Sequence, residues 1–124
     1  DVTIIAFSIM VGKSLEAANI LKDKNINAEV INLRTLRPLD IDTIIESVKK
    51  TNRVVTCEEG FPFSGIGAEI SALITEKAFD WLDAPVVRVT GKDVPMPYAA
   101  NLEKLALPQV DDIVSASAQV CYEN

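Results

Sequence analysis

Short apolar runs alternate along the chain with segments in which hydrophobic residues return every three or four positions. The apolar runs are rich in valine and isoleucine, which is typical of strands buried on both faces of a parallel sheet. We expect such strands at residues 2–7, 28–33, 53–57 and 86–90. Because strands alternate with helical segments, the pattern predicts an α/β fold with three α/β/α layers around a mainly parallel sheet of four or five strands.

The periodic segments predict helices at residues 13–24, 41–50, 67–77 and 109–121. The second helix is the clearest, because Ile41, Ile44, Ile45 and Val48 follow the i, i+3, i+4, i+7 spacing of a core-facing stripe. Asp40 stands where a residue that caps a helix N-terminus is expected.

Two further segments carry specific expectations. In the first helix, Leu15, Ala18 and Leu21 are expected to face the core. Residues 91–108 are expected to form one long irregular loop, because the prolines in it disfavour regular pairing. Loops of this length in small domains are often functional, so contact with a partner and simple closure of the fold are both open here.

Length and composition indicate one globular domain. The chain has 124 residues, of which 48% are hydrophobic and 24% charged, and this is enough to bury a single core. No apolar run approaches the roughly 18 residues that a membrane-spanning helix needs, so no membrane partner is expected. The net charge of −6 repels phosphate backbones and argues against nucleic acid, whereas it suits a basic protein surface.

The chain has few of the groups that a self-contained active site uses. It contains no histidine, the commonest proton shuttle near neutral pH. Cys57 and Cys121 are far apart in sequence and belong to no cluster with metal-ligand spacing, so we expect both to be buried reduced thiols. The composition therefore favours a domain for assembly over an independent catalyst.

A loop between the third strand and the third helix holds the best candidates for small-molecule chemistry. Gly65 and Gly67 at a helix start could bring backbone amides close to an anion, or could simply permit a tight turn and close packing. The tight turn is favoured, because the glutamates nearby would repel a phosphate. Glu58 and Glu59 could divide acid and base roles, but neighbours in an extended strand point to opposite faces, so a hydrogen-bond or salt-bridge role in the loop is favoured.

Three sets of exposed-type side chains are candidates for a partner interface: Arg34 and Arg37, Phe61 and Phe63, and Asp80 and Asp83. The arginines could clamp a carboxylate or phosphate, although pairing with acids of this domain or of a neighbouring chain is favoured. The two phenylalanines either contact another protein or fold back onto the core. The two aspartates are available to a cationic partner, although a solvated edge is favoured for them.

Several segments carry a family resemblance: EVINLRTLRPLD at 29–40, GIGAEI at 65–70, LDAP at 82–85 and RVTGKDVPMPY at 88–98. Together they resemble the C-terminal domain of the beta subunit of pyruvate dehydrogenase, the thiamine-dependent decarboxylating component, a domain with the transketolase C-terminal-domain-like fold. The resemblance covers essentially the whole chain in order. The segment DVPMPY at 93–98 makes the pyruvate branch the best match among transketolase-like relatives.

The resemblance implies an assembled parent enzyme, pyruvate dehydrogenase (acetyl-transferring). In this α2β2 heterotetramer pyruvate is decarboxylated on thiamine diphosphate with Mg²⁺, and the acetyl group passes to the lipoyl group of a dihydrolipoyl acyltransferase. The cofactor would lie between the alpha subunit and the N-terminal domain of beta. We therefore expect residues 1–124 to form one domain that by itself has no catalytic, cofactor-binding or metal site and no activity.

The resemblance also implies partners. The domain would contact the second beta subunit and present a docking surface for the small, basic subunit-binding module of the acyltransferase. Asp83 is the expected salt-bridge residue for that module, assisted by the terminal carboxylate of the chain.

Two other functions remain open, namely the beta subunit of a branched-chain 2-oxoacid dehydrogenase and a free-standing anion-binding α/β module. The chain begins at Asp1 with no methionine before its first apolar run, so we expect a piece of a longer subunit. The family implies the mitochondrial matrix, with a bacterial cytoplasm as the alternative.

Overall fold

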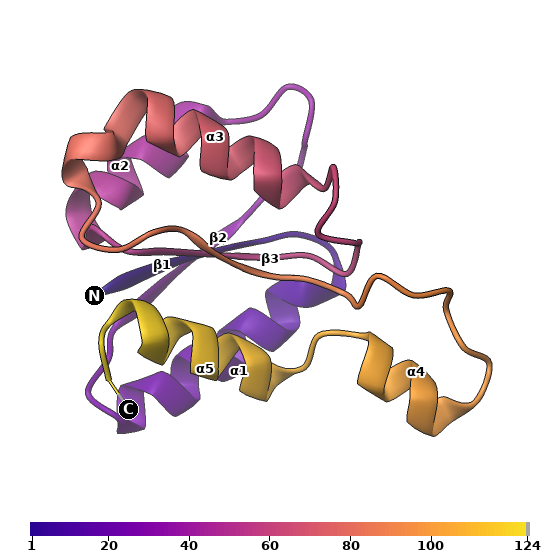
Figure 1. The fold of residues 1–124 in the computed structure, drawn as a ribbon. Helices are drawn as coiled ribbons and strands as arrows, with labels where there is room; N and C mark the ends of the chain where they lie inside the picture. Colours follow the sequence, from indigo (N-terminus) through magenta and orange to yellow (C-terminus); the bar gives the residue numbers. More distant parts are fainter. Residues whose placement is uncertain (124) are drawn as a thin grey trace.

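The computed structural model describes residues 1–123, which form a three-layer α/β/α domain (Figure 1). The central sheet has four parallel strands in the order β2-β1-β3-β4: β1 (Val2–Ala6), β2 (Ala28–Asn32), β3 (Val54–Cys57) and β4 (Val87–Val89). The predicted fold class is confirmed. Among the described residues, no helix is long and apolar enough to cross a membrane.

Helices cover both faces of the sheet. The helices are α1 (Ile9–Asp23), α2 (Ile41–Thr51), α3 (Ile66–Ala78), α4 (Ala100–Ala106) and α5 (Val110–Val120), with a short 3₁₀ turn η1 (Phe79–Trp81) after α3. In Figure 1, α2 and α3 lie on one face, and α1 and α5 lie on the other. Alternate residues of β1 serve the two layers, because Ile4 packs with α1 and α5 whereas Ile5 packs with α2 and α3.

The second helix forms as its sequence predicts. Ile44 and Val48 are fully buried, and Ile41 and Ile45 pack at the edge of the same core. Asp40 caps the helix by accepting hydrogen bonds from the Thr43 backbone N–H and hydroxyl at 3.2 and 2.7 Å. These bonds favour the charged carboxylate and lower the pKa of Asp40.

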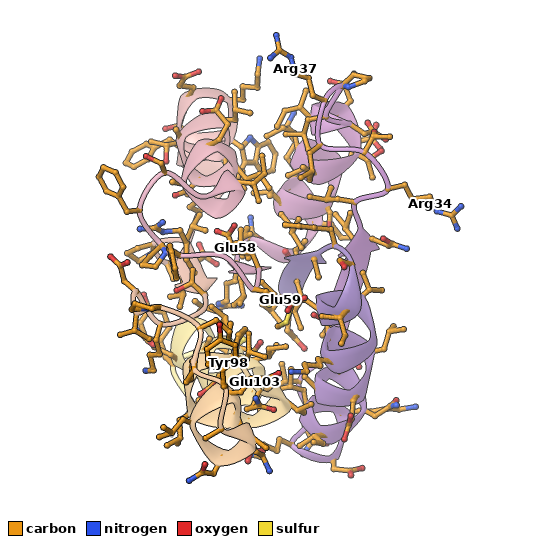
Figure 2. All side chains as sticks on the ribbon, turned by 90° about the vertical axis from the view of Figure 1, so that its right-hand side faces the viewer. Arg34, Arg37, Glu58, Glu59, Tyr98 and Glu103 are labelled. Atoms are coloured by element: carbon orange, nitrogen blue, oxygen red, sulfur yellow. The ribbon has the colours of Figure 1, made fainter. Side chains whose placement is uncertain are left out.

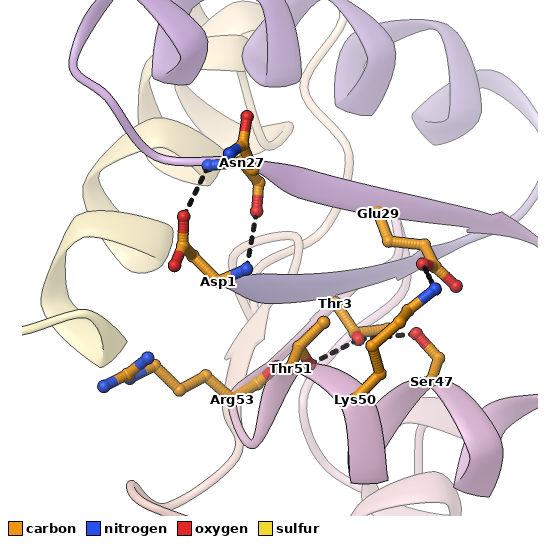
Figure 3. Close-up of polar contacts among 8 residues, drawn as sticks. All are labelled: Asp1, Thr3, Asn27, Glu29, Ser47, Lys50, Thr51 and Arg53. Atoms are coloured by element: carbon orange, nitrogen blue, oxygen red, sulfur yellow. Dashed lines mark hydrogen bonds and ion pairs between the residues drawn. The ribbon is translucent and has the colours of Figure 1, made fainter.

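A small polar network joins α2 to the sheet beneath it (Figure 3). The buried hydroxyl of Thr3 lies 2.7 Å from the hydroxyls of both Ser47 and Thr51. Nearby, Lys50 forms an ion pair with Glu29. The hydrogen bond from Lys50 is the main reason that the pKa of Glu29 is lowered. The network satisfies polar groups that would otherwise be costly to bury.

The first helix differs from its prediction in both start and phase. It begins at Ile9, four residues before the expected residue 13, and it buries Met10, Ala17 and Leu21. Leu21 is buried as expected and Ala18 is half-buried, but Leu15 is 53% exposed, so its predicted place in the core is wrong. The error has a physical cause: the buried face also contains the polar residue Ser14, which hides the true stripe from a hydrophobic pattern.

The expected irregular loop at residues 91–108 contains helix α4. This seven-residue helix buries only Ala106, whereas Leu102 and Leu105 are exposed. A helix that buries one small residue has no apolar stripe on which a sequence prediction could rest.

Candidate functional site

The six predicted interface residues lie at the two opposite ends of the parallel sheet. Those at the carboxyl end of the strands are Arg34, Arg37, Phe61 and Phe63, and those at the amino end are Asp80 and Asp83. Parallel topology explains the division, because loops that follow strands gather at one edge and connections that precede strands gather at the other. The domain therefore offers two separate candidate surfaces.

Glu58 anchors the carboxyl end. It is 4% exposed, and its Oε1 accepts a hydrogen bond from the Gly67 backbone N–H, in the first turn of α3, at 3.1 Å. A Cβ built at Gly65 would lie 2.6 Å from the same oxygen, and one at Gly67 would lie 2.9 Å from it. The glycines thus make room for a carboxylate of the chain itself, which fills the helix N-terminus that an external anion would need.

The neighbouring acid has a different environment. Glu59 is exposed whereas Glu58 is buried, so the two acids differ as expected, although both lie in the loop just after β3. The two carboxylates do not form an acid–base pair on one substrate. Glu58 has the hydrogen-bonding role in the loop that the sequence favoured.

The loop that follows Glu58 is fixed at several points. Arg88 donates from Nη1 to the Pro62 carbonyl at 2.7 Å, and the Gly91 N–H donates to the Gly60 carbonyl at 2.9 Å. These bonds join the end of β4 to the loop that carries Phe61 and Phe63. Both rings are exposed, Phe63 to 84%, so the reading in which they fold back onto the core is wrong.

Large apolar side chains are exposed in the segments that follow the strands, and Figure 1 shows these segments at one end of the sheet. We call the set the carboxyl-edge surface: Ile9, Leu36, Phe61, Phe63, Val94, Met96, Tyr98, Leu102 and Leu105. Exposed apolar side chains that gather on one face are typical of a protein-binding surface.

The two arginines do not converge. Arg34 and Arg37 are both exposed, and Figure 2 shows them extending outward at different places on the rim of this edge. Among the described residues, neither forms an ion pair with Asp40 or Asp42, so the expected pairing with these nearby acids is not observed. A bidentate clamp that uses both arginines on one anion is not formed in this arrangement.

Asp83 lies at the amino end of the sheet, and hydrogen bonds join its backbone to two other segments of the domain. Its backbone N–H donates to the Asn52 carbonyl at 2.9 Å, and its carbonyl accepts from the Tyr122 hydroxyl at 3.0 Å. Its carboxylate lies 3.8 Å from the Arg53 guanidinium and is part of a side chain that is 57% exposed. The backbone of Asp83 is therefore held in place, while its carboxylate is exposed and can meet a partner.

Exposed aromatic side chains precede Asp83 in the same connection or reach it from the end of α5, and we call Phe79, Asp80, Trp81, Asp83 and Tyr122 the amino-edge surface. All five are exposed. Trp81 is held in place from two sides, because Asn52 donates to its carbonyl at 2.7 Å and the Lys49 ammonium lies 5.5 Å from its ring centroid. The terminal carboxylate, which the sequence also proposed for docking, belongs to Asn124 and lies outside the described residues.

The two thiols are free, as the sequence predicts. Burial raises the pKa of the Cys57 thiol to about 12, so this side chain is an inert part of the core. Cys121 is half-buried, which is less than expected, and burial raises its pKa as well.

An open groove of about 650 Å³ runs along the free edge of β4. It is lined by residues of β4, α4 and α5, among them Arg88, Lys104 and Asp111. Its charges are mixed, and it contains neither a paired acid and base nor a nucleophile beside a base. The groove therefore suggests no reaction by itself.

The described residues do not fit thiamine diphosphate or its metal ion. The N-terminus of α3, the candidate anion site in the sequence, is filled by the carboxylate of Glu58. Within residues 1–123, no group of three or more acidic, cysteine or histidine side chains could hold a metal.

Comparison with known proteins gives a consistent result. Residues 1–113 match the family model described as transketolase, C-terminal domain. The chain is 64% identical over 122 residues to a protein of Rickettsia bellii named pyruvate dehydrogenase E1 component subunit beta. It is 63% identical over 122 residues to a mitochondrial E1 component subunit beta-1 of Oryza sativa subsp. japonica. Each alignment covers 98% of this chain, but only 38% of the Rickettsia protein and 33% of the rice protein.

A solved structure has the same fold. It is titled as a split gene transketolase, an inactive beta4 tetramer, and matches with a TM-score of 0.85 at 33% sequence identity. The match covers 98% of this chain and 38% of that one. The chain thus spans little more than a third of the length of these proteins.

Proposed function

This chain belongs to the transketolase C-terminal domain family, and from that premise we propose that it is the C-terminal domain of a pyruvate dehydrogenase E1 beta subunit. The observation that carries the proposal is the 64% identity to a subunit of that name, which extends over 98% of the chain. The parent enzyme would decarboxylate pyruvate on thiamine diphosphate and Mg²⁺ and acetylate the lipoyl group of the acyltransferase. This domain would contribute assembly and docking, and no reacting group.

The absence of a fit between the described residues and the cofactor supports a site elsewhere in the parent enzyme. Calorimetric titration of the 124-residue chain with thiamine diphosphate and Mg²⁺ tests this point. We expect no tight binding, and tight binding would contradict the assignment.

The main competing function is the beta subunit of a branched-chain 2-oxoacid dehydrogenase. Assay of the enzyme assembled from the full-length subunits, with pyruvate and with 3-methyl-2-oxobutanoate, separates the two. We expect a clear preference for pyruvate. A preference for 3-methyl-2-oxobutanoate would instead assign the domain to a branched-chain 2-oxoacid dehydrogenase.

The two surfaces have different proposed partners. We propose that the carboxyl-edge surface, which includes Phe61 and Phe63, contacts other subunits of the α2β2 enzyme. Arg34 and Arg37, at the rim of the same end, would take part in this contact. The exposed apolar side chains of the surface support this role, because such patches are seldom left in water. The solved structure titled as a tetramer is consistent with assembly through a domain of this fold.

We propose that the amino-edge surface docks the basic binding module of the acyltransferase through Asp83, with Asp80 beside it. The exposed carboxylate of Asp83 and the net charge of −6 support a cationic partner. In the assembled enzyme, Asp83→Lys should weaken binding of the module by about 2 kcal/mol or more. The matched control is Glu76→Lys on the outside of α3, which makes the same charge change and should leave the affinity unchanged.

The location follows the family. We propose the mitochondrial matrix, because the rice relative is named as mitochondrial, and a bacterial cytoplasm if the source is bacterial, since another relative comes from Rickettsia. Fractionation of the source cells with an antibody against the chain tests this.

A further inference from the structure

Three segments that are far apart in the sequence meet at Asp83. Asn52 follows α2, Asp83 precedes β4, and Tyr122 follows α5. The backbone N–H of Asp83 is bonded to Asn52, and its backbone C=O is bonded to the Tyr122 hydroxyl. The two polar groups of the Asp83 backbone are therefore both engaged, each by a different segment of the domain.

The Asp83 carboxylate, in contrast, keeps most of its capacity to bind. Its distance of 3.8 Å to the Arg53 guanidinium is longer than a hydrogen bond. A carboxylate has about four acceptor sites. A basic side chain of a partner can therefore approach without first breaking a strong internal bond.

We propose that Tyr122 is a positioning residue for this docking acid, with its hydroxyl fixing the turn from which the Asp83 carboxylate meets a cationic protein. The inference rests on the proposed docking function of Asp83. An acid on a fixed turn loses less conformational freedom when it binds, so part of the affinity comes from this preorganisation.

The geometry of Tyr122 supports a positioning role more than a packing role. The side chain is 70% exposed, so it contributes little buried area. Its backbone is fixed at φ 58°, and its N–H donates to the Gln119 carbonyl at 3.1 Å. The ring is thus held by the end of α5, and the hydroxyl transmits that constraint to Asp83.

The chemistry of the surface defines the partner. Phe79 and Trp81, in the connection that leads to Asp83, and Tyr122, which bonds to it, offer exposed aromatic area. Lysine and arginine side chains lay their aliphatic stems on such area while their charged ends reach a carboxylate. The surface therefore fits a small protein module that projects a basic side chain.

The test uses the enzyme assembled from full-length subunits. The acyltransferase's binding module is titrated by calorimetry into the wild type, Tyr122→Phe, Asp83→Asn and the double variant. We expect Tyr122→Phe to weaken binding about threefold, the effect of one neutral hydrogen bond at a solvated site. The control is Ser115→Ala, which removes an exposed hydroxyl from the middle of α5 and should leave the dissociation constant unchanged.

The double variant separates positioning from direct contact. If Tyr122 acts through Asp83, the double variant should bind as Asp83→Asn alone does. Hydrogen exchange at the Asp83 amide should also be faster in Tyr122→Phe, because the turn loses one of its two backbone restraints. Neither effect is expected for a hydroxyl that only stabilises the domain as a whole.

The alternatives give distinct results. An unchanged dissociation constant in Tyr122→Phe, together with weaker binding in Asp83→Asn, overturns the positioning role and leaves the docking proposal intact. Additive losses in the double variant also overturn positioning, because Tyr122 would then touch the partner itself. Unchanged binding in Asp83→Asn overturns the docking proposal and the inference with it.

Discussion

Gly91 is the position at which a single added carbon should do most damage to the carboxyl end. A Cβ built there would lie 2.2 Å from the Glu59 carbonyl oxygen and 3.3 Å from its carbonyl carbon. Both are backbone atoms, which cannot turn aside as a flexible side chain does. Gly91→Ala must therefore separate the end of β4 from the loop that carries Phe61 and Phe63.

The cost can be worked out from these contacts. The φ of Gly91 is not positive, so alanine meets no backbone strain and the whole effect is steric. Restoring an ordinary carbon–oxygen contact requires a shift of about 1 Å, an overpacking that costs about 1–3 kcal/mol. The same shift weakens the hydrogen bond from the Gly91 N–H to the Gly60 carbonyl, which contributes about 1 kcal/mol. We expect a loss of about 2–4 kcal/mol in the free energy of unfolding.

Urea unfolding of the 124-residue chain measures this loss as a lower midpoint at constant slope. Gly12→Ala is the matched control, because the same methyl group on α1 would have no heavy atom within 4 Å. In an exposed helix it should raise stability by about 0.5–1 kcal/mol. If Gly91→Ala were as harmless as Gly12→Ala, the steric reasoning would be refuted.

Three further predictions follow from local chemistry. Asn52 has a left-handed backbone (φ 65°) and donates a hydrogen bond to the Trp81 carbonyl. Asn52→Ala should therefore lower the free energy of unfolding, measured in urea, by about 1–2 kcal/mol. Asn52→Gly should lower it less, because glycine adopts the left-handed backbone without strain. The lowered pKa of Glu29 gives stability that is present above its unfolded pKa and lost as pH falls. The difference in free energy of unfolding between wild type and Glu29→Gln should therefore become smaller as the pH falls from 6 to 3. At pH 6 this difference should be below about 1 kcal/mol, because the Glu29 side chain is 38% exposed. Cys57, with its pKa raised to about 12, should resist iodoacetamide at pH 8 until the chain is unfolded, and peptide mapping by mass spectrometry checks this; rapid native labelling would contradict its burial.

The sequence predicted the layers because their cause is local. The continuous apolar runs of β1 and β3 require burial on both faces, and the stripe of α2 requires a core on one side. The Asp40 cap was also visible, because a cap acts on residues only three positions away. Features that depend on neighbours in sequence were therefore predicted well.

The sequence could not predict the features that depend on contacts across the fold. The hydrogen bonds to the Asp83 backbone come from Tyr122, 39 positions away, and from Asn52, 31 positions away. No periodic pattern in the sequence connects either residue with that acid. The burial of Glu58 depends on the room left by Gly65 and Gly67, although an acid before a pair of glycines was a partial signal. Tyr122 and Asn52 were missed as functional candidates because their contacts with Asp83 are set by tertiary distance.

The separation of the two surfaces follows from the direction of the strands. At the carboxyl end, the connections at residues 33–40, 58–65 and 90–99 are long, and they carry large side chains that the core does not need. At the amino end, the connections at residues 24–27 and 52–53 are short, so the backbone there is pinned by direct hydrogen bonds to nearby segments. The direction of the strands thus separates the exposed apolar side chains at one end from Asp80 and Asp83 at the other. Since the two ends share no residues, the subunit assembly and the docking of a basic module that we propose would not compete for the same side chains.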